Sequence, residues 1–427
     1  MNAPRTVAAG GPLRGTVRVP GDKSASHRAV MLSALADGTS TIRGLSPGLD
    51  VAATAIIMQQ LGAEWTVNGS DVTVVGPSSG LHASDAALDC GNSGTTMRLL
   101  AGIVSSVRGS HQLVGDASLT SRPMDRVVTP LNMMGARITG RGTRVTAPLM
   151  IQGQPSLRSI EYAVPMPSAQ VKSALLLAGL QASGHTVVRE AVRTRSTTED
   201  MLRHAGVTVH SIDEGPGRTV TVTPGRPNPA QWEIPGDPSQ AAFFAVLGAV
   251  HGDAIIDVAA IDAARERVGF VDVLQRMQAR VAWRTSRGEV SLHSESSALV
   301  ATEVFSHEIP SVDEIPALVV AAGAARGVSA FRDMGELRVK ESDRFVGAMN
   351  LARALGCRTW DEGDDFFVEG LGHASAFEEF AVTAGFDHRM VMASAVAGVA
   401  GHGCRISGSE TVTSSYPNFF DDLASLL

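Results

Sequence analysis

The chain has 427 residues, of which 44% are hydrophobic and 19% charged, a composition typical of globular proteins and a length that favours two domains. Its net charge of -7 argues against nucleic acid or an anionic membrane as the main partner, so an anionic ligand would need a local basic cluster. Three widely spaced cysteines without a CxxC pair, and the lack of an apolar run long enough to span a bilayer, indicate a cytoplasmic protein without a disulfide or zinc framework.

Lysine is rare in this sequence. The 36 basic residues include only three lysines, Lys23, Lys172 and Lys340. We interpret them as positions that need a compact ammonium on a flexible stem, which a planar guanidinium cannot replace. All three fall within the charged segments described below.

A recurring unit runs along the chain, in which an amphipathic helix ends at a Gly-type stop and a β-hairpin follows. The stops recur about every 70 to 80 residues, at Gly62, Gly135, Gly206, Gln278 and Gly356. The C-terminal DDLASLL predicts a sixth helix, and the N-terminal PLRGTVRVPG a strand that completes the sixth unit. We therefore expect one domain over 22–235 and a second over 1–21 plus 236–427.

The first charged helix start is Pro20–Arg28, where a Gly turn precedes a helix that we expect to begin near Ser26. Lys23 and Arg28 flank this start, where unsatisfied N–H groups and the helix dipole favour an anion. Ser24 or Ser26 could instead act only as an N-cap.

Four further helix starts in the first half share small or hydroxylic residues and a cation. In Cys90–Arg98, the turn of small residues suits close approach of the backbone to a ligand. The four starts are Cys90–Arg98, Gly115–Met124 with Pro123 in the first helical turn, Pro165–Lys172, and Thr194–Glu199, where Ser196 and Glu199 have the spacing of a capping box.

The second half supplies titratable groups. Asp313 precedes a small apolar helix, and His388 and Arg389 open another. In Glu336–Arg344 we expect Lys340, Glu341 and Arg344 to share one end of a helix, although such Glu–Arg pairs are commonly solvated. Anion sites at several helix starts, with Asp313, Glu341 and His388 for proton transfer, indicate a transferase of phosphorylated metabolites at a two-domain cleft. No metal or nucleotide motif is present.

Seven segments, in this order, resemble the 5-enolpyruvylshikimate-3-phosphate synthase family across the whole chain: PGDKSxSHR, NSGTTMR, DxSLxxRPM, SAQVKSALLLAGL, DEIP, RVKESDR and DHRM. The resemblance implies an α/β, two-domain inverse α/β barrel-like fold built from six βαβαββ repeats, three per domain. It also implies transfer of the enolpyruvyl group of phosphoenolpyruvate to the 5-hydroxyl of shikimate 3-phosphate through a tetrahedral intermediate, a step in chorismate and aromatic amino acid biosynthesis.

The resemblance also implies the roles of individual residues. The expected catalytic residues are Lys23, Asp313, Glu341 and His388. Shikimate 3-phosphate, held mainly by domain one, would be bound by Lys23, Ser24, Arg28, Ser168, Ala169, Gln170, Arg195, Asp313 and Lys340. Phosphoenolpyruvate would be bound by Lys23, Asn92, Gly94, Arg122, Gln170, Arg344 and Arg389. The herbicide glyphosate would occupy the phosphoenolpyruvate site, where Gly94 leaves room for it.

The sequence departs from the family pattern at Thr413–Pro417, where some members carry a lysine and this chain has none. One alternative is a UDP-N-acetylglucosamine enolpyruvyl transferase, but that family has a loop cysteine where this chain reads Ser118–Arg122. The other is a non-catalytic phosphometabolite-binding relative, which should have lost its proton-transfer groups. We expect a monomer without cofactor, metal, nucleic acid or membrane partner.

Overall fold

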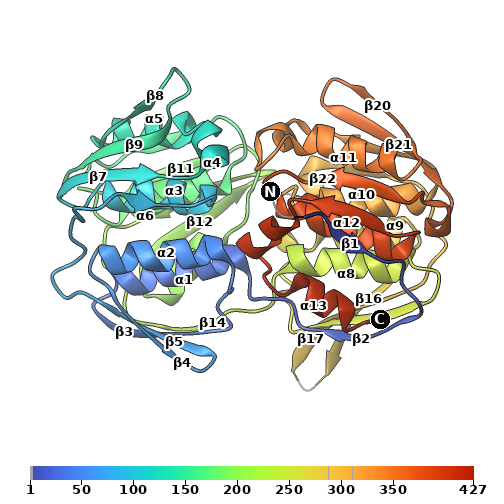
Figure 1. The fold of residues 1–427 in the computed structure, drawn as a ribbon. Coiled ribbons are helices and arrows are strands. Elements are labelled where there is room, and N and C mark those ends of the chain that lie inside the picture. Colours follow the sequence, from blue (N-terminus) through green and yellow to red (C-terminus); the bar gives the residue numbers. More distant parts are fainter. Residues whose placement is uncertain (1–2, 287, 310) are drawn as a thin grey trace. The chain divides into compact units, whose positions relative to one another are not determined.

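The computed structural model describes residues 3–286, 288–309 and 311–427, which form two compact units (Figure 1). Unit 1 comprises Met1–Pro20 and Pro235–Leu427, and unit 2 comprises Gly21–Ile234. These limits differ by one residue from the domain boundaries expected from the sequence. Residues 1 and 2 of the expected second domain lie outside the described residues.

Unit 2 contains three four-stranded sheets. In spatial order the first is β14 (Gln231–Glu233), β3 (Gly38–Arg43), β5 (Asp71–Gly76) and β4 (Glu64–Asn68). The second is β6 (Leu88–Asp89), β7 (Gly109–Val114), β9 (Thr146–Gly153) and β8 (Arg137–Arg141). The third is β10 (Glu161–Val164), β11 (Thr186–Glu190), β13 (Gly217–Val222) and β12 (Val209–Glu214). Its helices are α1 (Lys23–Leu35), α2 (Leu49–Gln60), α3 (Gly94–Val104), α4 (Ala117–Ser121), α5 (Asp125–Met133), α6 (Ala169–Gly179) and α7 (Thr197–His204).

Unit 1 contains two four-stranded sheets and a three-stranded one. The first is β16 (Arg280–Ser286), β17 (Glu289–Glu295), β15 (Ala254–Ala259) and β2 (Leu13–Val17). The second is β18 (Glu303–Phe305), β19 (Arg326–Arg332), β21 (Asp365–Leu371) and β20 (Arg358–Glu362), and the third is β1 (Arg5–Val7), β23 (Cys404–Ser407) and β22 (Phe380–Thr383). Its α-helices are α8 (Pro238–Val250), α9 (Gly269–Arg276), α10 (Ile315–Ala324), α11 (Arg344–Ala354), α12 (His388–Ala400) and α13 (Phe419–Ala424). Its 3-10 turns are η1 (Arg265–Arg267), η2 (Ser306–Glu308), η3 (Gly335–Val339), η4 (Ala374–Ala376) and η5 (Ser409–Ser414).

Three of the four-stranded sheets are each formed by one contiguous βαβαββ repeat. In the other two, the edge strand that pairs parallel with its neighbour comes from a distant segment, β14 beside β3 and β2 beside β15. In the second sheet of unit 2, β6 pairs parallel with β7 across α3, and the hairpin β8–β9 returns antiparallel after α5. The repeat predicted from the sequence is therefore confirmed, as is the α/β class. Among the described residues the six sheets are separate and no closed barrel forms.

The predicted helix stops all have left-handed backbone conformations. Gly62, Gly135, Gly206 and Gly356 have φ values of 108°, 96°, 78° and 94°, and Gln278 has φ 66° at the corresponding position. A residue without a Cβ adopts this region readily, which explains the preference for glycine after the last helical turn.

The prediction for the N-terminal strand was only partly correct. Leu13–Val17 (β2) pairs parallel with β15, so it opens the first repeat of unit 1 and does not complete the sixth. A strand that the sequence analysis did not name, β1, pairs antiparallel with β23 in the sixth. Alternation in these short segments indicates a strand, but the partner depends on long-range packing.

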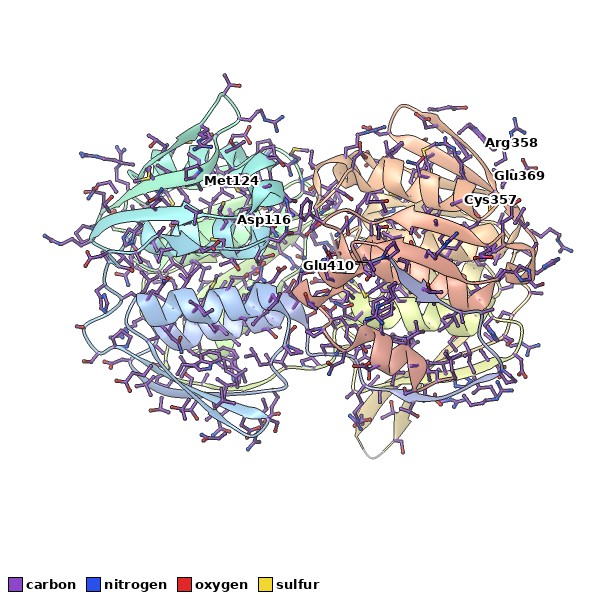
Figure 2. The ribbon with its side chains drawn as sticks, viewed as in Figure 1. Asp116, Met124, Cys357, Arg358, Glu369 and Glu410 are labelled. Atoms are coloured by element: carbon purple, nitrogen blue, oxygen red, sulfur yellow. The ribbon has the colours of Figure 1, made fainter. Side chains whose placement is uncertain are left out.

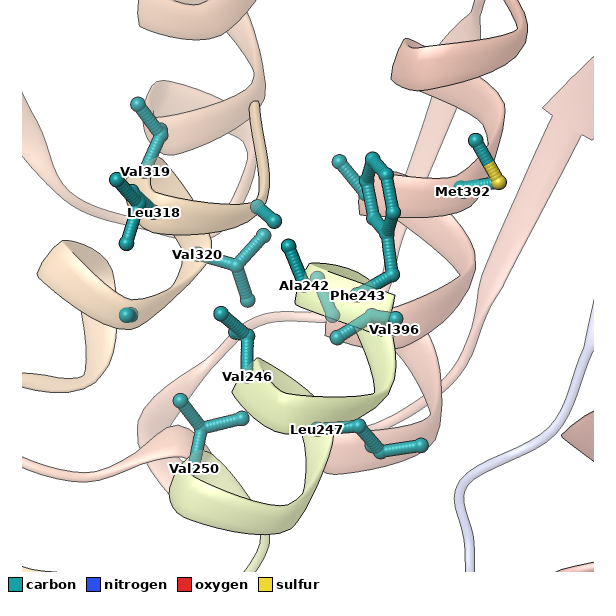
Figure 3. Close-up of a cluster of buried hydrophobic side chains, with 14 of the residues drawn as sticks. Ala242, Phe243, Val246, Leu247, Val250, Leu318, Val319, Val320, Met392 and Val396 are labelled. Atoms are coloured by element: carbon teal, nitrogen blue, oxygen red, sulfur yellow. The ribbon is translucent and has the colours of Figure 1, made fainter. Parts of the chain in front are cut away.

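The core of unit 1 is formed by helices without a polar face. Every residue of α8, α10 and α12 is buried, and the three helices pack against one another through small and branched side chains (Figure 3). Ala242, Val246, Val320 and Val396 lie in this cluster. Although these helices are buried all round, α12 carries two titratable side chains, His388 and Arg389, and both lie at its start. In the described residues no helix is both long and apolar enough to cross a membrane.

Unit 1 should fold only when residues 1–20 are attached. Pro20 O accepts a hydrogen bond from Asp237 N at 2.9 Å, so residues 1–20 can be joined to Pro235–Leu427 by a short Gly-Ser linker in place of Gly21–Ile234. We expect this chain to unfold cooperatively in urea, and Pro235–Leu427 alone to lack a cooperative transition, because it loses β1, β2 and the buried Leu13. Circular dichroism measures both, with Gly21–Ile234 as the control. Equal urea midpoints with and without residues 1–20 would contradict the assignment of residues 1–20 to unit 1.

Candidate functional site

The first charged cluster of unit 2 surrounds the start of α1. The helix begins at Lys23, three residues before the start expected at Ser26. The Asp22 carboxylate caps it by accepting from Ala25 N at 2.6 Å, so the alternative in which Ser24 or Ser26 is the N-cap does not hold. Lys23 Nζ lies 3.0 Å from Asp50 Oδ2, and the two side chains are 14% and 8% exposed. A lysine at a helix start, paired with one carboxylate and still reaching solvent, can also contact an anion.

Arg28 is almost completely buried one turn further along α1. Its Nε donates to Thr198 Oγ1 at 2.6 Å and its Nη2 to Ser173 Oγ at 2.7 Å, while Nη1 donates to the carbonyl of Ser24 at 2.8 Å. Arg195 Nη1 donates to Ser24 Oγ at 3.4 Å. The structure therefore brings Ser24, Arg28 and Arg195 together, as the sequence predicted for one ligand.

The start of α6 contacts α3 through an amide. Ser168 caps α6, with Val171 N donating to its hydroxyl at 3.4 Å, and Ala169 is the first helical residue. Gln170 Nε2 donates to Thr95 Oγ1 at 3.0 Å, and Arg98 Nη1 donates to Gln170 Oε1 at 2.7 Å. Arg98 was absent from the predicted site. Its position four residues after Gly94, on the same face of one helix, is the signal that could have found it.

A second polar group joins the start of α3 to the segment around α4. Arg122 Nη2 donates to Asn92 Oδ1 at 2.7 Å and to Ser118 Oγ at 3.1 Å. Asn92 Nδ2 in turn donates to Asp116 Oδ2 at 2.6 Å, and Asp116, labelled in Figure 2, caps α4. The hydrogen bonds hold the Arg122 guanidinium, 5% exposed, in one orientation.

Gly94 is the first residue of α3 and lies against two guanidinium groups. A Cβ at this position would be 2.7 Å from Arg98 Nη1 and 3.3 Å from Arg122 Nη1. Even a methyl group would therefore displace Arg98. Pro123, expected in the first turn of a helix, lies before α5, which begins at Asp125.

His27 links α1 to α2 and α3 through a chain of buried hydroxyl groups. Its Nδ1 lies 2.8 Å from Thr54 Oγ1, which lies 2.7 Å from Thr96 Oγ1. Burial and the charges of Lys23 and Arg28 lower the pKa of His27 well below its usual value, so the imidazole is neutral at neutral pH. A third cation beside Lys23 and Arg28 is thereby avoided.

In unit 1, Arg344 binds three carboxylates. Its Nη1 donates to Asp313 Oδ1 at 2.8 Å, its Nη2 lies 2.7 Å from Glu341 Oε2, and its Nε donates to Asp387 Oδ2 at 2.8 Å. Burial alone would lower the pKa of Arg344, but these three negative charges outweigh it and raise the pKa above its usual value. The guanidinium is a permanent charge that orients Asp313 and Glu341.

Asp313 lies just before α10 and faces several cations. Burial would raise its pKa, but the charges of Arg389, Arg344 and Lys340 outweigh burial and hold the pKa well below its usual range. Asp313 is therefore a carboxylate at neutral pH, able to accept a proton or a hydrogen bond but not to donate one.

Arg389 has buried guanidinium nitrogens that no described residue satisfies. Its side chain is 2% exposed, and within the described parts of the chain its Nε and Nη1 have no hydrogen-bond acceptor. Its Nη2 lies 3.7 Å from Asp313 Oδ2. Because buried donors are nearly always satisfied, by water where the chain offers no acceptor, these two nitrogens are suited to binding an anion.

The local prediction around Lys340 was wrong. Lys340 and Glu341 lie between η3 and α11, and only Arg344 is on the helix, which Asp343 caps. Lys340 Nζ is 3.6 Å from Glu336 Oε1, a partly exposed pair that holds it only weakly. His388, by contrast, is the first residue of α12 as expected, and its Nδ1 lies 3.1 Å from Ser414 Oγ. Ser414 belongs to Thr413–Pro417, the segment where some family members carry a lysine and this chain has none.

The capping box expected at Ser196 does not form. Ser196 precedes α7 without accepting a bond from the helix, and its hydroxyl donates to Asp200. Glu199 is fully buried and lies 2.7 Å from Lys172 Nζ. The spacing was correct for a capping box, but a buried cation attracts this carboxylate more strongly.

Repeated βαβαββ units with paired cations at helix starts define an α/β protein with polar groups suited to small, multiply charged anions. The family model of EPSP synthase (3-phosphoshikimate 1-carboxyvinyltransferase) matches residues 7–423. Curated proteins named 3-phosphoshikimate 1-carboxyvinyltransferase from Bacillus cereus and Bacillus anthracis are 40% identical over 423 residues, covering 97% of this chain and of each relative. The chain belongs to the EPSP synthase family.

Solved structures agree with this assignment. An EPSP synthase from Acinetobacter baumannii superposes with a TM-score of 0.84 at 35% identity, covering 100% of this chain and 98% of that one. The enolpyruvyl transferase NikO from Streptomyces tendae gives a TM-score of 0.80 at 20% identity over 100% of this chain and 98% of that one, which shows the fold alone.

Proposed function

We propose that this chain transfers the enolpyruvyl group of phosphoenolpyruvate to the 5-hydroxyl of shikimate 3-phosphate and releases phosphate. Membership of the EPSP synthase family supports the reaction. The observation that carries it in this structure is Arg389, whose buried and unsatisfied N–H groups lie beside the ionised Asp313. An anion with several acceptor oxygens would satisfy these groups.

Shikimate 3-phosphate is assigned to the cluster around Arg28. Two arginines with fixed guanidinium groups can bind its phosphate, and hydroxyl and amide groups can bind the ring substituents. The proposed ligands in unit 2 are Lys23, Ser24, Arg28, Ser168, Ala169, Gln170 and Arg195, and in unit 1 they are Asp313 and Lys340.

Phosphoenolpyruvate is assigned to the cations near Gly94 and at the start of α12. The proposed ligands are Lys23, Asn92, Gly94, Arg122, Gln170, Arg344 and Arg389. Arg344 already binds three carboxylates, so its main part in this proposal is to orient them. Arg389 keeps two N–H groups for the donor anion.

The chemistry is an addition followed by an elimination. In the addition, the acceptor oxygen bonds to C2 of phosphoenolpyruvate, C3 gains a proton, and the hydroxyl proton passes to a base. In the elimination, the C–O bond to phosphate breaks and C3 loses a proton, which leaves the enolpyruvyl ether. Asp313 is the proposed base because it is ionised and can accept the hydroxyl proton, although its lowered pKa makes it a weak base. Glu341 and Lys23 are the proposed groups for proton transfer at C3, and His388 supports them.

The alternatives have less support. A cysteine-dependent transferase of UDP-sugars would need a reactive thiol, but burial raises the pKa of Cys357 to about 11 and of Cys404 to about 12, and raises that of Cys90 even further. A non-catalytic relative would not need Asp313, Glu341 and Arg344 in one hydrogen-bonded group.

Phosphate release tests the proposed reaction directly. With phosphoenolpyruvate as donor, we expect release to depend on shikimate 3-phosphate and to be absent with UDP-N-acetylglucosamine. A coupled phosphate assay measures release with each acceptor. Mass spectrometry of the product checks that the acceptor has gained the mass of an enolpyruvyl group. Release only with the UDP-sugar would overturn the proposal.

Lys23→Arg and Lys340→Arg should each lower kcat/KM at least about tenfold, equivalent to ~1.4 kcal/mol. A guanidinium keeps the charge but is wider than the ammonium that Lys23 places 3.0 Å from Asp50. Steady-state kinetics with both substrates measure the loss. Arg358→Lys is the matched control, since this exposed residue pairs with Glu369 across β20 and β21 (Figure 2). Wild-type kinetics in either lysine variant would refute its role.

Gly94→Ala should weaken glyphosate more than phosphoenolpyruvate. The added methyl group would displace the Arg98 guanidinium, 2.7 Å away, and disturb its bond to Gln170, and the larger inhibitor has less room to adjust. We expect the inhibition constant to rise at least about tenfold, with a smaller rise in KM for phosphoenolpyruvate. Inhibition titrations at fixed donor measure it, with Gly225→Ala, where a Cβ meets no atom within 4 Å, as the control. Equal inhibition constants in the Gly94 variant and wild type would place Gly94 outside the donor site.

A further inference from the structure

Lys172 is the one lysine that the proposed function does not use, and its side chain is fully buried in unit 2. It lies on α6, one turn after Ser168–Gln170. Its Nζ donates to Glu190 Oε2 at 2.8 Å and to the carbonyl of Thr194 at 3.4 Å, and it lies 2.7 Å from Glu199 Oε1. The ammonium therefore contacts the end of β11, the segment that follows it and the first turn of α7.

These contacts enclose the segment that carries Arg195. Residues 191–196 connect β11 to α7, and Thr194 donates its hydroxyl to Glu190 while its carbonyl accepts from Lys172. The residue before Arg195 is thus held at both its side chain and its backbone. Arg195 reaches Ser24 Oγ from this anchored position.

A second layer, of hydroxyl groups, links the buried ions to Arg28. Ser173 follows Lys172 on α6, and Thr198 precedes Glu199 on α7. Because the Ser173 hydroxyl donates to the carbonyl of Ala169 at 2.6 Å, the Thr198 hydroxyl donates to Ser173 Oγ, also at 2.6 Å. Both oxygens can then accept from Arg28, as the bonds from Nε and Nη2 require.

The cluster holds one cation and two carboxylates away from water. Burial raises the pKa of Glu199 even though Lys172 opposes this, and Glu190 adds to the rise. Among the described residues Glu199 Oε2 has no hydrogen-bond partner. Removing the ammonium would leave two buried carboxylates facing each other, so the attachment of α7 and of residues 191–196 to α6 depends on Lys172.

We propose that Lys172 is a positioning residue for the acceptor, which through Glu190, Glu199 and Thr194 fixes residues 191–196 and α7 and so sets Arg28 and Arg195 for the phosphate of shikimate 3-phosphate. The inference rests on the proposed function. Lys172 touches neither substrate. Its effect is on acceptor affinity, and the donor ligands Asn92 and Arg122 lie outside its contacts.

Two variants test this role in the full-length protein. Lys172→Met keeps the length of the stem and removes the charge, and Glu199→Gln keeps the volume and weakens the tie between Lys172 and α7. We expect Lys172→Met to raise KM and Kd for shikimate 3-phosphate at least about tenfold and Glu199→Gln several-fold, with KM for phosphoenolpyruvate changed less than about threefold in both. Kinetics and titration calorimetry with shikimate 3-phosphate measure these quantities.

Leu202→Ala is the control for simple destabilisation. Leu202 is a buried residue of the same helix without a part in the ion cluster, so its loss should lower the urea midpoint without a selective change in acceptor affinity. The proposal fails if a folded Lys172→Met protein keeps wild-type affinity for shikimate 3-phosphate, or if its affinities for both substrates fall equally. If Lys172→Met does not fold, Glu199→Gln decides by the same criterion.

Failure of the proposed function gives a different result. A wild-type protein that binds shikimate 3-phosphate without turnover would refute the reaction, and the series of Kd values would still decide the role of Lys172. A wild-type protein that neither turns over nor binds shikimate 3-phosphate would refute both.

Discussion

A cation that is removed from water must be surrounded by acceptors, and this requirement organises the polar interior of both units. Arg344 binds carboxylates from three separate segments of unit 1, and Lys172 binds Glu190 and Glu199, which lie on either side of residues 191–196 in unit 2. Each buried charge therefore helps to fix the position of the segments that carry its partners. Arg389 departs from this pattern, because its Nε and Nη1 find no acceptor within the described chain. A ligand that supplies oxygen atoms would complete the same pattern.

The repeat explains why these charges occur at helix starts. Helices of the repeat such as α10 and α12 are buried on all sides, and the titratable side chains of α12, His388 and Arg389, lie at its start. At the N-terminal ends, unsatisfied N–H groups and the helix dipole favour anions. One local architecture, repeated along the chain, thus produces many equivalent places where phosphate or carboxylate groups can be bound, and substitution at those places gives each one its own chemistry.

Several features of the site were predictable because they depend on local sequence. The left-handed stops at Gly62 and Gln278 follow from spacing, and the start of α12 at His388 follows from Asp387 as an N-cap. Predictions failed where a distant partner outcompeted a local one. Ser24 was expected as a possible cap, but Asp22 caps α1 and Ser24 binds Arg195. Glu199 had capping-box spacing, but Lys172 draws it into the interior. The strand at Leu13–Val17 was correct as a strand and wrong in its partner.

The sequence by itself determined the repeat, the α/β class, the family resemblance and most of the charged residues proposed for the candidate site. These features depend on periodicity, helix stops and contiguous motifs, which are contained in short stretches of chain. Only the tertiary structure decided which charges neutralise one another. It showed that Arg344 is occupied by carboxylates, that Arg389 retains unsatisfied donors, and that Lys172 lies beneath the segment carrying Arg195 rather than at the surface. The physical reason is that the energy of a buried charge depends on all the groups packed around it, and those groups come from segments far apart in sequence.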